Sequence, residues 1–404
     1  MAETQSGPKT QEVLDLYAKY VIGNYTRLPR VAVRGEGAYV WDADGKRYLD
    51  LFSGWAVTGL GHCHPRLAEA IAAQARTLIY MPNTWCTEPQ ARLAEWIATT
   101  GFGGKSFFCN SGAEANEAAI KLARIHTAKG KYKIITFENS FHGRTFAAIT
   151  ATAQPKYQQG FQPLVPGFAY APLNDLAAVE KLVDEETCAI LVEPIQGEGG
   201  VNVAAPEFLQ ALRDLCDQRG MVLVFDEVQT GMGRCGTWWG WQQSGVVPDI
   251  MTMAKQLGGG TAIGAMCARD EVAASLVPGT HASTFGGNPL AAAAGCAVFE
   301  IMRDENLLDH VKEMGTYVRQ RFLELKQELP LITEVRGAGL MIGVELAEQG
   351  AGIVAVCLDR GLHMNCTHGT VLRVMPPLNI TRQELDEGLG ILADVLREHR
   401  AAEN

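Results

Sequence analysis

An acidic and a basic side chain each stand directly behind a strongly apolar segment of this sequence. The segment MVLVF is followed by Asp226, and the segment IMTMA is followed by Lys255, just before a glycine triplet. In open parallel α/β sheets, ligands bind beyond the carboxyl ends of the strands, so we expect both side chains in one pocket. A lysine that forms an imine and an aspartate that holds a pyridinium proton are the groups that a pyridoxal phosphate enzyme requires.

A candidate phosphate cradle lies in NSGAEANEAAIKLAR, which follows the strand-like SFFC. The run begins a helix at Ser111, Gly112 and Ala113. The first turn of a helix presents unpaired amides and a positive dipole end, and glycine lets an anion approach the backbone. Taken alone, the motif fits an ordinary capped helix better, because short motifs often match by chance.

Two further segments place chemically useful side chains after strand-like runs. The segment ENSFHGRT follows KIITF and carries Phe141, which could stack on a planar cofactor, and Arg144, which could grip a carboxylate. The alternatives are a core ring and a surface ion pair. CAILVEP, which carries Glu193, continues into IQGEGG, which carries Glu198. These acids fit helix capping or solvation equally well.

Composition narrows the functional classes. The chain has 404 residues, of which 47% are hydrophobic, with 35 basic and 45 acidic residues for a formal net charge of −10. Such a chain can bury a large core, and its charge offers no basic field for nucleic acid or anionic membranes. The ten cysteines form no C-x-x-C pair, and no targeting segment is visible, so we expect a cytoplasmic protein with free thiols and no metal site.

Hydrophobic patterning predicts two domains. Residues 12–22 have helical spacing, and AYVWDADGKRYLDLF predicts a hairpin around Asp44 and Gly45. From residue 65 to 295, apolar runs alternate with helical stretches, which indicates a large domain of βα units with a mainly parallel sheet. We expect residues 1–64 and 296–404 to form a smaller α+β domain, with Thr381 and Glu384 as a capping box before the last helix.

The ordered motifs together resemble class III pyridoxal phosphate aminotransferases, from about residue 25 to residue 389. The resemblance rests on RGEGAYVWDADGKRYLD, GLGHCHP, NSGAEANEAAIKLAR, FHGRT, EPIQGEGG, FDEVQTGMGR, AKQLGGG, HASTFGGNPLAAAAG and NCTHGTVLRVMPPL. It implies the α/β architecture known as fold-type I, with a large doubly wound domain and a small domain from both termini. It also implies a homodimer whose active sites lie between the subunits. The implied cofactor is pyridoxal 5'-phosphate.

The resemblance also implies roles for individual residues. Lys255 would hold the cofactor covalently, Asp226 would pair with its pyridine nitrogen and Phe141 would stack on its ring. The other implied cofactor contacts are Ser111, Gly112, Ala113, Glu227, Val228, Gln229 and, in the neighbouring subunit, Thr284. The implied substrate contacts are Arg144, Glu198, Arg373, Tyr25 and, in the neighbouring subunit, Ser283.

The expected reaction moves the terminal amino group of N-acetylornithine to 2-oxoglutarate, as in arginine biosynthesis. Glu198 would neutralise Arg373 while the donor binds and release it to hold a carboxylate of 2-oxoglutarate. Ornithine, succinylornithine and 4-aminobutyrate stay open as donors, because Trp55 stands where an aliphatic residue is commoner in relatives that act on N-acetylornithine. From another class, a nicotinamide-dependent oxidoreductase would use the G-x-G-x-x-G match at residues 231–236.

Overall fold

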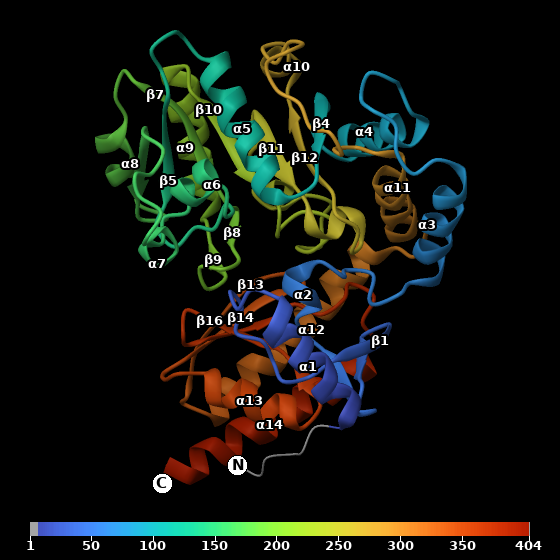
Figure 1. The fold of residues 1–404 in the computed structure, drawn as a ribbon. Coiled ribbons are helices and arrows are strands. Elements are labelled where there is room, and N and C mark those ends of the chain that lie inside the picture. Colours follow the sequence, from blue (N-terminus) through green and yellow to red (C-terminus); the bar gives the residue numbers. More distant parts are fainter. Residues whose placement is uncertain (1–6, 404) are drawn as a thin grey trace.

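The computed structural model describes residues 7–403. Its elements gather in two parts, shown in the upper and lower halves of Figure 1. The upper part holds the strands and helices from the middle of the chain. The lower part combines elements from both ends of the sequence, among them α1 (Pro8–Tyr20) and α14 (Arg382–Glu403).

The upper part is built on a seven-stranded sheet with the strand order β4-β12-β11-β10-β7-β5-β6. Neighbours β11, β10, β7, β5 and β6 are parallel, whereas β12 runs antiparallel to both β11 and β4. The strands are β4 (Lys105–Cys109), β5 (Lys133–Phe137), β6 (Phe168–Ala171), β7 (Thr187–Val192), β10 (Val222–Asp226), β11 (Ile250–Met253) and β12 (Gly264–Ala268). The mainly parallel sheet that the sequence predicts is confirmed.

Apolar sequence on both faces of these strands explains why helices cover the sheet on both sides. β7, β10, β11 and β12 are buried along their whole length. Such strands need a helical layer on each face. α5 (Gly112–His126) packs on β11 and β12, and α9 (Pro206–Arg219) packs on β7 and β10. In Figure 1, α5 lies in front of the sheet and α9 behind it.

The lower part contains two four-stranded sheets. One has the order β1-β2-β3-β15 and joins both chain ends, because β15 from the C-terminal segment pairs in parallel with β3. The other has the order β13-β14-β17-β16. Their strands are β1 (Ala32–Glu36), β2 (Tyr39–Asp42), β3 (Arg47–Asp50), β15 (Leu362–His363), β13 (Ile332–Ala338), β14 (Met341–Leu346), β16 (Asn365–Thr367) and β17 (Val371–Val374); β8 (Ile195–Gln196) and β9 (Asn202–Val203) form a separate ribbon.

The remaining helices connect and cover these sheets. They are α2 (Ser53–Ala56), α3 (Pro65–Thr77), α4 (Glu88–Thr100), α6 (Phe146–Ala151), α7 (Pro155–Gln158), α8 (Leu176–Leu182), α10 (Asp270–Ala273), α11 (Pro289–Asp304), α12 (Leu307–Glu328) and α13 (Ala351–Asp359), with 3₁₀ turns at Gly240–Gln243 and Lys255–Gly258. A domain boundary at residue 295 would divide α11, which packs on both α3 and α4. The expected domain limits, residues 65–295 against residues 1–64 and 296–404, therefore stay a prediction.

Local predictions at both chain ends agree with the structure. The N-terminal helix is present as α1, although it begins at Pro8, and proline is favoured in the first turn of a helix. The hairpin at Gly45 joins β2 to β3. Before α14, Thr381 N donates to Glu384 Oε2 at 2.7 Å and Glu384 N donates to Thr381 Oγ1 at 3.2 Å, a complete capping box. No helix among the described residues is long and apolar enough to cross a membrane.

Candidate active site

A pocket of about 420 Å³ opens at the carboxyl ends of the parallel strands. Asp226 ends β10, and its register partner on β11 is Thr252, so Lys255 follows within three residues on the adjacent strand exit. Both Asp226 and Lys255 line the pocket, together with Phe141 and Arg144. The parallel arrangement thus brings together side chains that the sequence separates widely.

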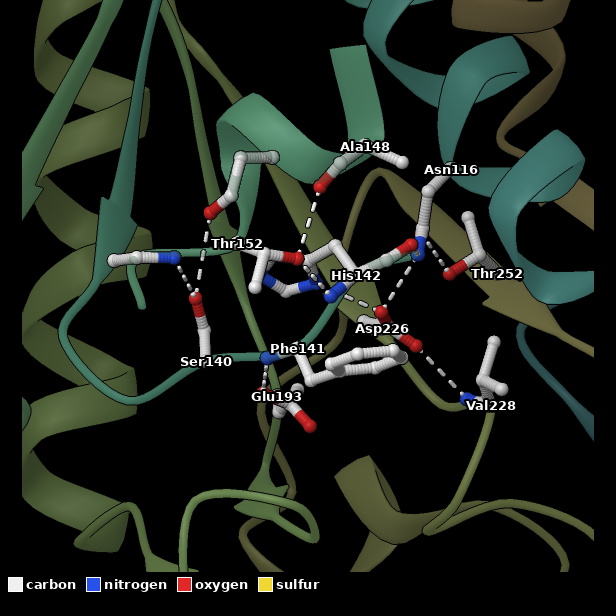
Figure 2. A network of polar contacts seen from close by, with 12 residues as sticks. Asn116, Ser140, Phe141, His142, Ala148, Thr152, Glu193, Asp226, Val228 and Thr252 are labelled. Atoms are coloured by element: carbon white, nitrogen blue, oxygen red, sulfur yellow. Dashed lines mark hydrogen bonds and ion pairs between the residues drawn. The ribbon is translucent and has the colours of Figure 1, made fainter. Parts of the chain in front are cut away.

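Asp226 is held by three hydrogen bonds, drawn in Figure 2. Its Oδ2 lies 2.8 Å from both Asn116 Nδ2 and His142 Nδ1, and its Oδ1 accepts the Val228 amide at 3.0 Å. A carboxylate only accepts, so Nδ1 of His142 carries the proton. Two donors occupy Oδ2, whereas Oδ1 has one donor and keeps an acceptor site. The network therefore fixes which oxygen can serve a further N–H group.

The donors to Asp226 are themselves fixed. Asn116 on α5 also donates to the His142 carbonyl at 2.8 Å, and its Oδ1 accepts Thr252 Oγ1 at 2.7 Å. The His142 amide donates to Thr152 Oγ1 at 2.8 Å. Asp226, Asn116, His142, Thr152 and Thr252 are all buried (Figure 2). Hydrogen bonds fix each of these side chains, although Nε2 of His142 is buried without a partner among the described residues.

Lys255 begins the 3₁₀ turn after β11 in a left-handed conformation, with φ of 49°. Such a conformation costs about 1 kcal/mol or more in a residue other than glycine and is often found at functional sites. Burial lowers the pKa of Lys255 from 10.5 to about 8, although the negative charges of Glu198 and Asp226 oppose the shift. No atom of the described residues hydrogen-bonds to Nζ. The amine is therefore available as a nucleophile or base near neutral pH.

The first turn of α5 forms one wall of this pocket. Ser111 caps the helix by accepting the Glu114 amide at 3.2 Å, while the Glu114 carboxylate receives the Asn110 amide. The amides of Gly112 and Ala113 have no acceptor among residues 7–403, and both residues line the pocket. A Cβ on Gly112 would come within 2.9 Å of the Val228 side chain. The wall is therefore a dense arrangement of free donors that suits a phosphate.

A buried amide and a buried acid complete the pocket. Gln229 lines it, and Oε1 of this side chain is buried without a partner among the described residues. Glu193 accepts the Phe141 amide at 3.0 Å (Figure 2). Burial, with a further contribution from Asp226, raises the pKa of Glu193 well above its ordinary value. Glu193 thus anchors the backbone of the predicted stacking residue, and its burial disfavours the charged form of its carboxyl group.

A second pocket of about 1010 Å³ adjoins the first and shares Phe141, Arg144 and Lys255 with it. It is also lined by Tyr25 and Trp55. The Arg144 guanidinium has no carboxylate within ion-pair distance among the side chains that the structure describes. An exposed, unpaired guanidinium beside an amine offers a place for the carboxylate of an amino-acid substrate.

Glu198 lines the second pocket and forms an ion pair with Arg373, which does not line it. Arg373 on β17 is fully buried, and its Nη1 lies 2.8 Å from Glu198 Oε1. Its Nε donates to Asn365 Oδ1 at 2.7 Å, and its Nη2 is buried without a partner. Burial alone would raise the pKa of Glu198, but the charges of Arg373 and Lys255 outweigh it and hold the pKa below its ordinary value. Glu198 and Arg373 are therefore paired in the structure, and the expected release of Arg373 stays a prediction.

Four predicted site residues lie outside both pockets: Glu227, Ser283, Thr284 and Arg373, of which Arg373 is connected to the second pocket by its ion pair with Glu198. Glu227 turns away from the pocket, and its carboxylate accepts the amides of Gly240 and Trp241 at 2.8 and 2.6 Å. The expectation that Glu227 contacts the cofactor therefore needs correction, because alternate residues of an extended chain point in opposite directions. Ser283 lines a separate pocket, and Thr284 lines neither of the two described above. Their expected contacts lie in a neighbouring subunit and stay predictions.

The G-x-G-x-x-G match at residues 231–236 is not a dinucleotide motif in this structure. The segment forms turns, is buried, and leads into the short 3₁₀ turn Gly240–Gln243 instead of an α-helix. Arg234 within it is fully buried and donates to the carbonyls of Leu340 and Pro376. The segment thus joins the two parts of the molecule and lacks the helix N-terminus that a pyrophosphate needs.

Sequence reasoning missed Asn116, Lys156 and Tyr157. Asn116 could have been found, because it is a polar residue on the buried, alanine-rich side of α5. Lys156 and Tyr157 line the second pocket from the one-turn helix α7. Nothing in PKYQQG marks them, since their role depends on contacts with another segment of the chain, the loop that carries Phe141 and Arg144.

Comparison with known proteins agrees with this geometry. The class-III aminotransferase family profile matches residues 20–396. The chain belongs to this family. Class-III aminotransferases depend on pyridoxal phosphate, and the chain is a transaminase of this kind. The nicotinamide-dependent alternative is therefore wrong, and the fold is that of the family.

Individual relatives are similar over nearly the whole length. Acetylornithine aminotransferase from Caldanaerobacter subterraneus is 52% identical, and the match covers 95% of this chain and 98% of that protein. The solved N-acetylornithine aminotransferase of Stenotrophomonas maltophilia is 37% identical with a TM-score of 0.83, covering 96% of this chain and all of that one. An ornithine aminotransferase from Toxoplasma gondii, solved with partial occupancy of pyridoxal phosphate in its active site, is 33% identical with a TM-score of 0.92, covering 97% and 96%.

Proposed function

We propose that this class-III aminotransferase transfers the terminal amino group of N-acetylornithine to 2-oxoglutarate, giving N-acetylglutamate 5-semialdehyde and glutamate, a step of arginine biosynthesis. The observation that carries the proposal is the charge arrangement around Lys255. One arginine, Arg144, is unpaired, and a second, Arg373, is neutralised by Glu198. One free cation suits a donor with one carboxylate, and a second, releasable cation suits a dicarboxylate acceptor.

The residues of the first pocket fit pyridoxal 5'-phosphate. The free amides at Gly112 and Ala113, with Ser111, would hold the phosphate, and the orphaned Oε1 of Gln229 shows an unfilled polar contact. Asp226 Oδ1 would accept the pyridine N–H and Phe141 would stack on the ring. When bound, the cofactor supplies an electrophilic carbon and a ring that withdraws electrons from the reacting carbon.

The protein itself contributes charge and proton transfer. Asp226 offers its carboxylate at the pocket floor, where Asn116, His142 and Val228 all donate to it. Lys255 would accept the proton from the donor's amine-bearing carbon at Nζ and return it, which its lowered pKa favours near neutral pH. The same amine would hold the cofactor between turnovers.

Charge balance explains how one site would accept two different substrates. N-acetylornithine carries one carboxylate, which Arg144 would bind while Glu198 keeps Arg373 neutral. 2-Oxoglutarate carries two carboxylates, so it requires Arg373 as a second cation. Leaving Arg373 buried without either partner would be costly. We therefore infer that Glu198 moves away only when the acceptor's carboxylate replaces it.

Replacing Glu198 tests this exchange. In Glu198→Gln, Arg373 keeps a hydrogen-bond acceptor but loses the neutralising charge. We expect the ratio of kcat/KM for 2-oxoglutarate to kcat/KM for N-acetylornithine to change about tenfold, in favour of the acceptor, because a charged hydrogen bond is worth a few kcal/mol at most. Steady-state kinetics with each substrate varied in turn would measure this ratio.

Glu345→Gln is a matched control for this variant. Glu345 also pairs with an arginine, Arg336, at 2.7 Å, but it lies on β14 outside both pockets. The control should leave the ratio unchanged. An unchanged ratio in Glu198→Gln as well would remove the proposed exchange while leaving the rest of the site intact.

A homodimer is part of the proposal. Large apolar side chains are exposed on the segments around residues 78–85 and 285, with Trp85 65% and Phe285 61% exposed. Ser283 and Thr284, which precede Phe285, line neither the first nor the second pocket of their own chain. A partner subunit would cover the apolar surface and receive these hydroxyls at its own site. The charge balance and the unpaired cysteines favour a cytoplasmic location.

Ornithine is a second candidate donor, because Trp55 presents an aromatic ring in the second pocket. Competition among donors decides between the two. We expect kcat/KM, measured as glutamate formed from 2-oxoglutarate, to be highest with N-acetylornithine and lower with ornithine, succinylornithine and 4-aminobutyrate. A higher value with ornithine would reassign the donor but keep the class of reaction.

A further inference from the structure

The ring of Tyr157 lies beneath the unpaired guanidinium of the site. The Arg144 guanidinium carbon is 3.9 Å from the centre of the Tyr157 ring and 5.5 Å from that of Phe141. The two rings meet edge to face, with centres 5.7 Å apart and planes at 85°. Arg144 therefore rests on an aromatic corner formed by the predicted stacking residue and by Tyr157. A guanidinium over a ring is attracted to its negative face.

Hydrogen bonds tie Tyr157 to the loop that carries Arg144. Gln154, just before α7, is buried, and its Nε2 donates to the carbonyls of Asn139 and Ser140 at 3.1 and 2.9 Å. At the other end of α7, Gln158 Nε2 donates to the Thr152 carbonyl at 2.9 Å. Both ends of this single helical turn are thus fixed. The backbone that carries Tyr157 is therefore held beside the loop that carries Arg144, which keeps the ring within reach of the guanidinium.

The hydroxyl of Tyr157 takes no part in this arrangement. No hydrogen bond joins it to any described residue, whereas the ring contacts two cations. Lys156 Nζ lies 4.7 Å from the ring centre and also lines the second pocket. A carboxylate that reaches Arg144 therefore meets two positive charges near one aromatic surface. Among the residues lining this pocket, Glu198 is the one carboxylate, and it already pairs with Arg373.

We propose that Tyr157 is a positioning residue for the carboxylate of the amino donor. Its ring would hold Arg144 in the pocket in the absence of substrate, so that little side-chain entropy is lost when the carboxylate binds. Tyr157 would then determine the affinity for donors with a carboxylate and leave the chemistry at Lys255 unaffected. This inference rests on the proposed function, because it needs a donor that Arg144 binds.

Two substitutions of Tyr157 test the inference. Tyr157→Leu removes the ring, and Tyr157→Phe removes only the hydroxyl. We expect Tyr157→Leu to raise the KM for N-acetylornithine about tenfold, with kcat changed less than about twofold, because a cation–π contact of this kind is worth roughly one factor of ten. Tyr157→Phe should match the unmodified enzyme. The cofactor's visible absorbance at saturation should be the same in all three proteins.

A donor without a carboxylate distinguishes positioning from general damage. N-acetylputrescine has the skeleton of N-acetylornithine without its carboxylate, so its kcat/KM should be equal in the unmodified enzyme and Tyr157→Leu. The dissociation constant of N-acetylnorvaline, which keeps the carboxylate but lacks the reacting amine, should rise about tenfold in Tyr157→Leu by calorimetry.

Two kinetic results would overturn the proposed role of Tyr157. Equal KM values for N-acetylornithine in the unmodified enzyme and Tyr157→Leu would overturn the inference. So would an equal loss with N-acetylputrescine, which would indicate a structural role for Tyr157. If the unmodified enzyme does not use N-acetylornithine, the proposed function fails first, and the calorimetry with N-acetylnorvaline still tests whether Tyr157 governs carboxylate binding.

Discussion

Lys255→Ala is expected to lose transaminase activity by about 10⁴-fold or more. The substitution removes one amine that has two roles, because Lys255 both moves the proton and holds the cofactor. Proton transfer alone typically accounts for 10²–10⁴-fold in rate. Turnover of N-acetylornithine with 2-oxoglutarate measures the loss. The exposed Lys312 on α12, which pairs with Asp309, gives a matched control, and Lys312→Ala should retain full activity.

The lowered pKa of Lys255 adds a pH signature to this test. Its pKa is about 8 because burial disfavours the ammonium form. The protonated amine cannot attack, so capture of added pyridoxal phosphate by the cofactor-free protein should speed up as pH rises through about 8 and level off above it. A lysine with an ordinary pKa would still gain about tenfold per pH unit at pH 9. Substantial activity in Lys255→Ala, or capture without this profile, would contradict the assignment of Lys255.

Asp226→Asn should lower kcat by about 10³-fold, the second largest effect that we expect. The amide keeps the shape of the carboxylate but carries no charge, so the pyridine nitrogen would lose the partner that keeps it protonated. Fixed charges in buried sites commonly contribute factors of 10²–10³. The three donors that converge on Asp226 also lose a charged acceptor, so weaker cofactor binding should accompany the slower turnover. Turnover and a cofactor titration by absorbance measure the two effects.

The adjacent acid provides the control for Asp226. Glu227 is equally buried, but its carboxylate binds Thr230 and the amides of Gly240 and Trp241, away from the pocket. Burial raises its pKa to about 7. Glu227→Gln should therefore change thermal stability more than kcat. If Glu227→Gln lost as much activity as Asp226→Asn, the result would contradict the assignment of Asp226 to the pocket and of Glu227 to contacts outside it.

The parts of the site that depend on strand exits could be predicted from sequence. Apolar runs of four or five residues ending in Asp226 or preceding Lys255 indicate buried parallel strands, and such strands deliver their next side chains to one edge. Ser111 could be predicted as a cap, because its spacing from Glu114 is local. These inferences use only periodicity and short-range hydrogen bonding, which the sequence displays directly.

Other features depend on contacts that no local pattern records. β12 runs antiparallel between β4 and β11, and its short segment GAMCA has no signal for direction. Glu227 directly follows Asp226 in the sequence, but its side chain turns away from the pocket. Residues 53–56, which include Trp55, all have positive φ, a conformation that backbone sterics disfavour and that the surrounding packing must impose. The stacking of Arg144 on Tyr157 likewise joins loops that only the folded chain brings together.

The most direct test of the proposed amino transfer is the visible spectrum of the protein loaded with pyridoxal phosphate. It is recorded before and after N-acetylornithine is added without any keto acid. The cofactor's visible band should disappear in proportion to the donor added and return when 2-oxoglutarate is added, since each half of the transfer then proceeds alone. A visible band that ignores N-acetylornithine would contradict the proposed donor, and a protein that takes up no cofactor would contradict the proposed site.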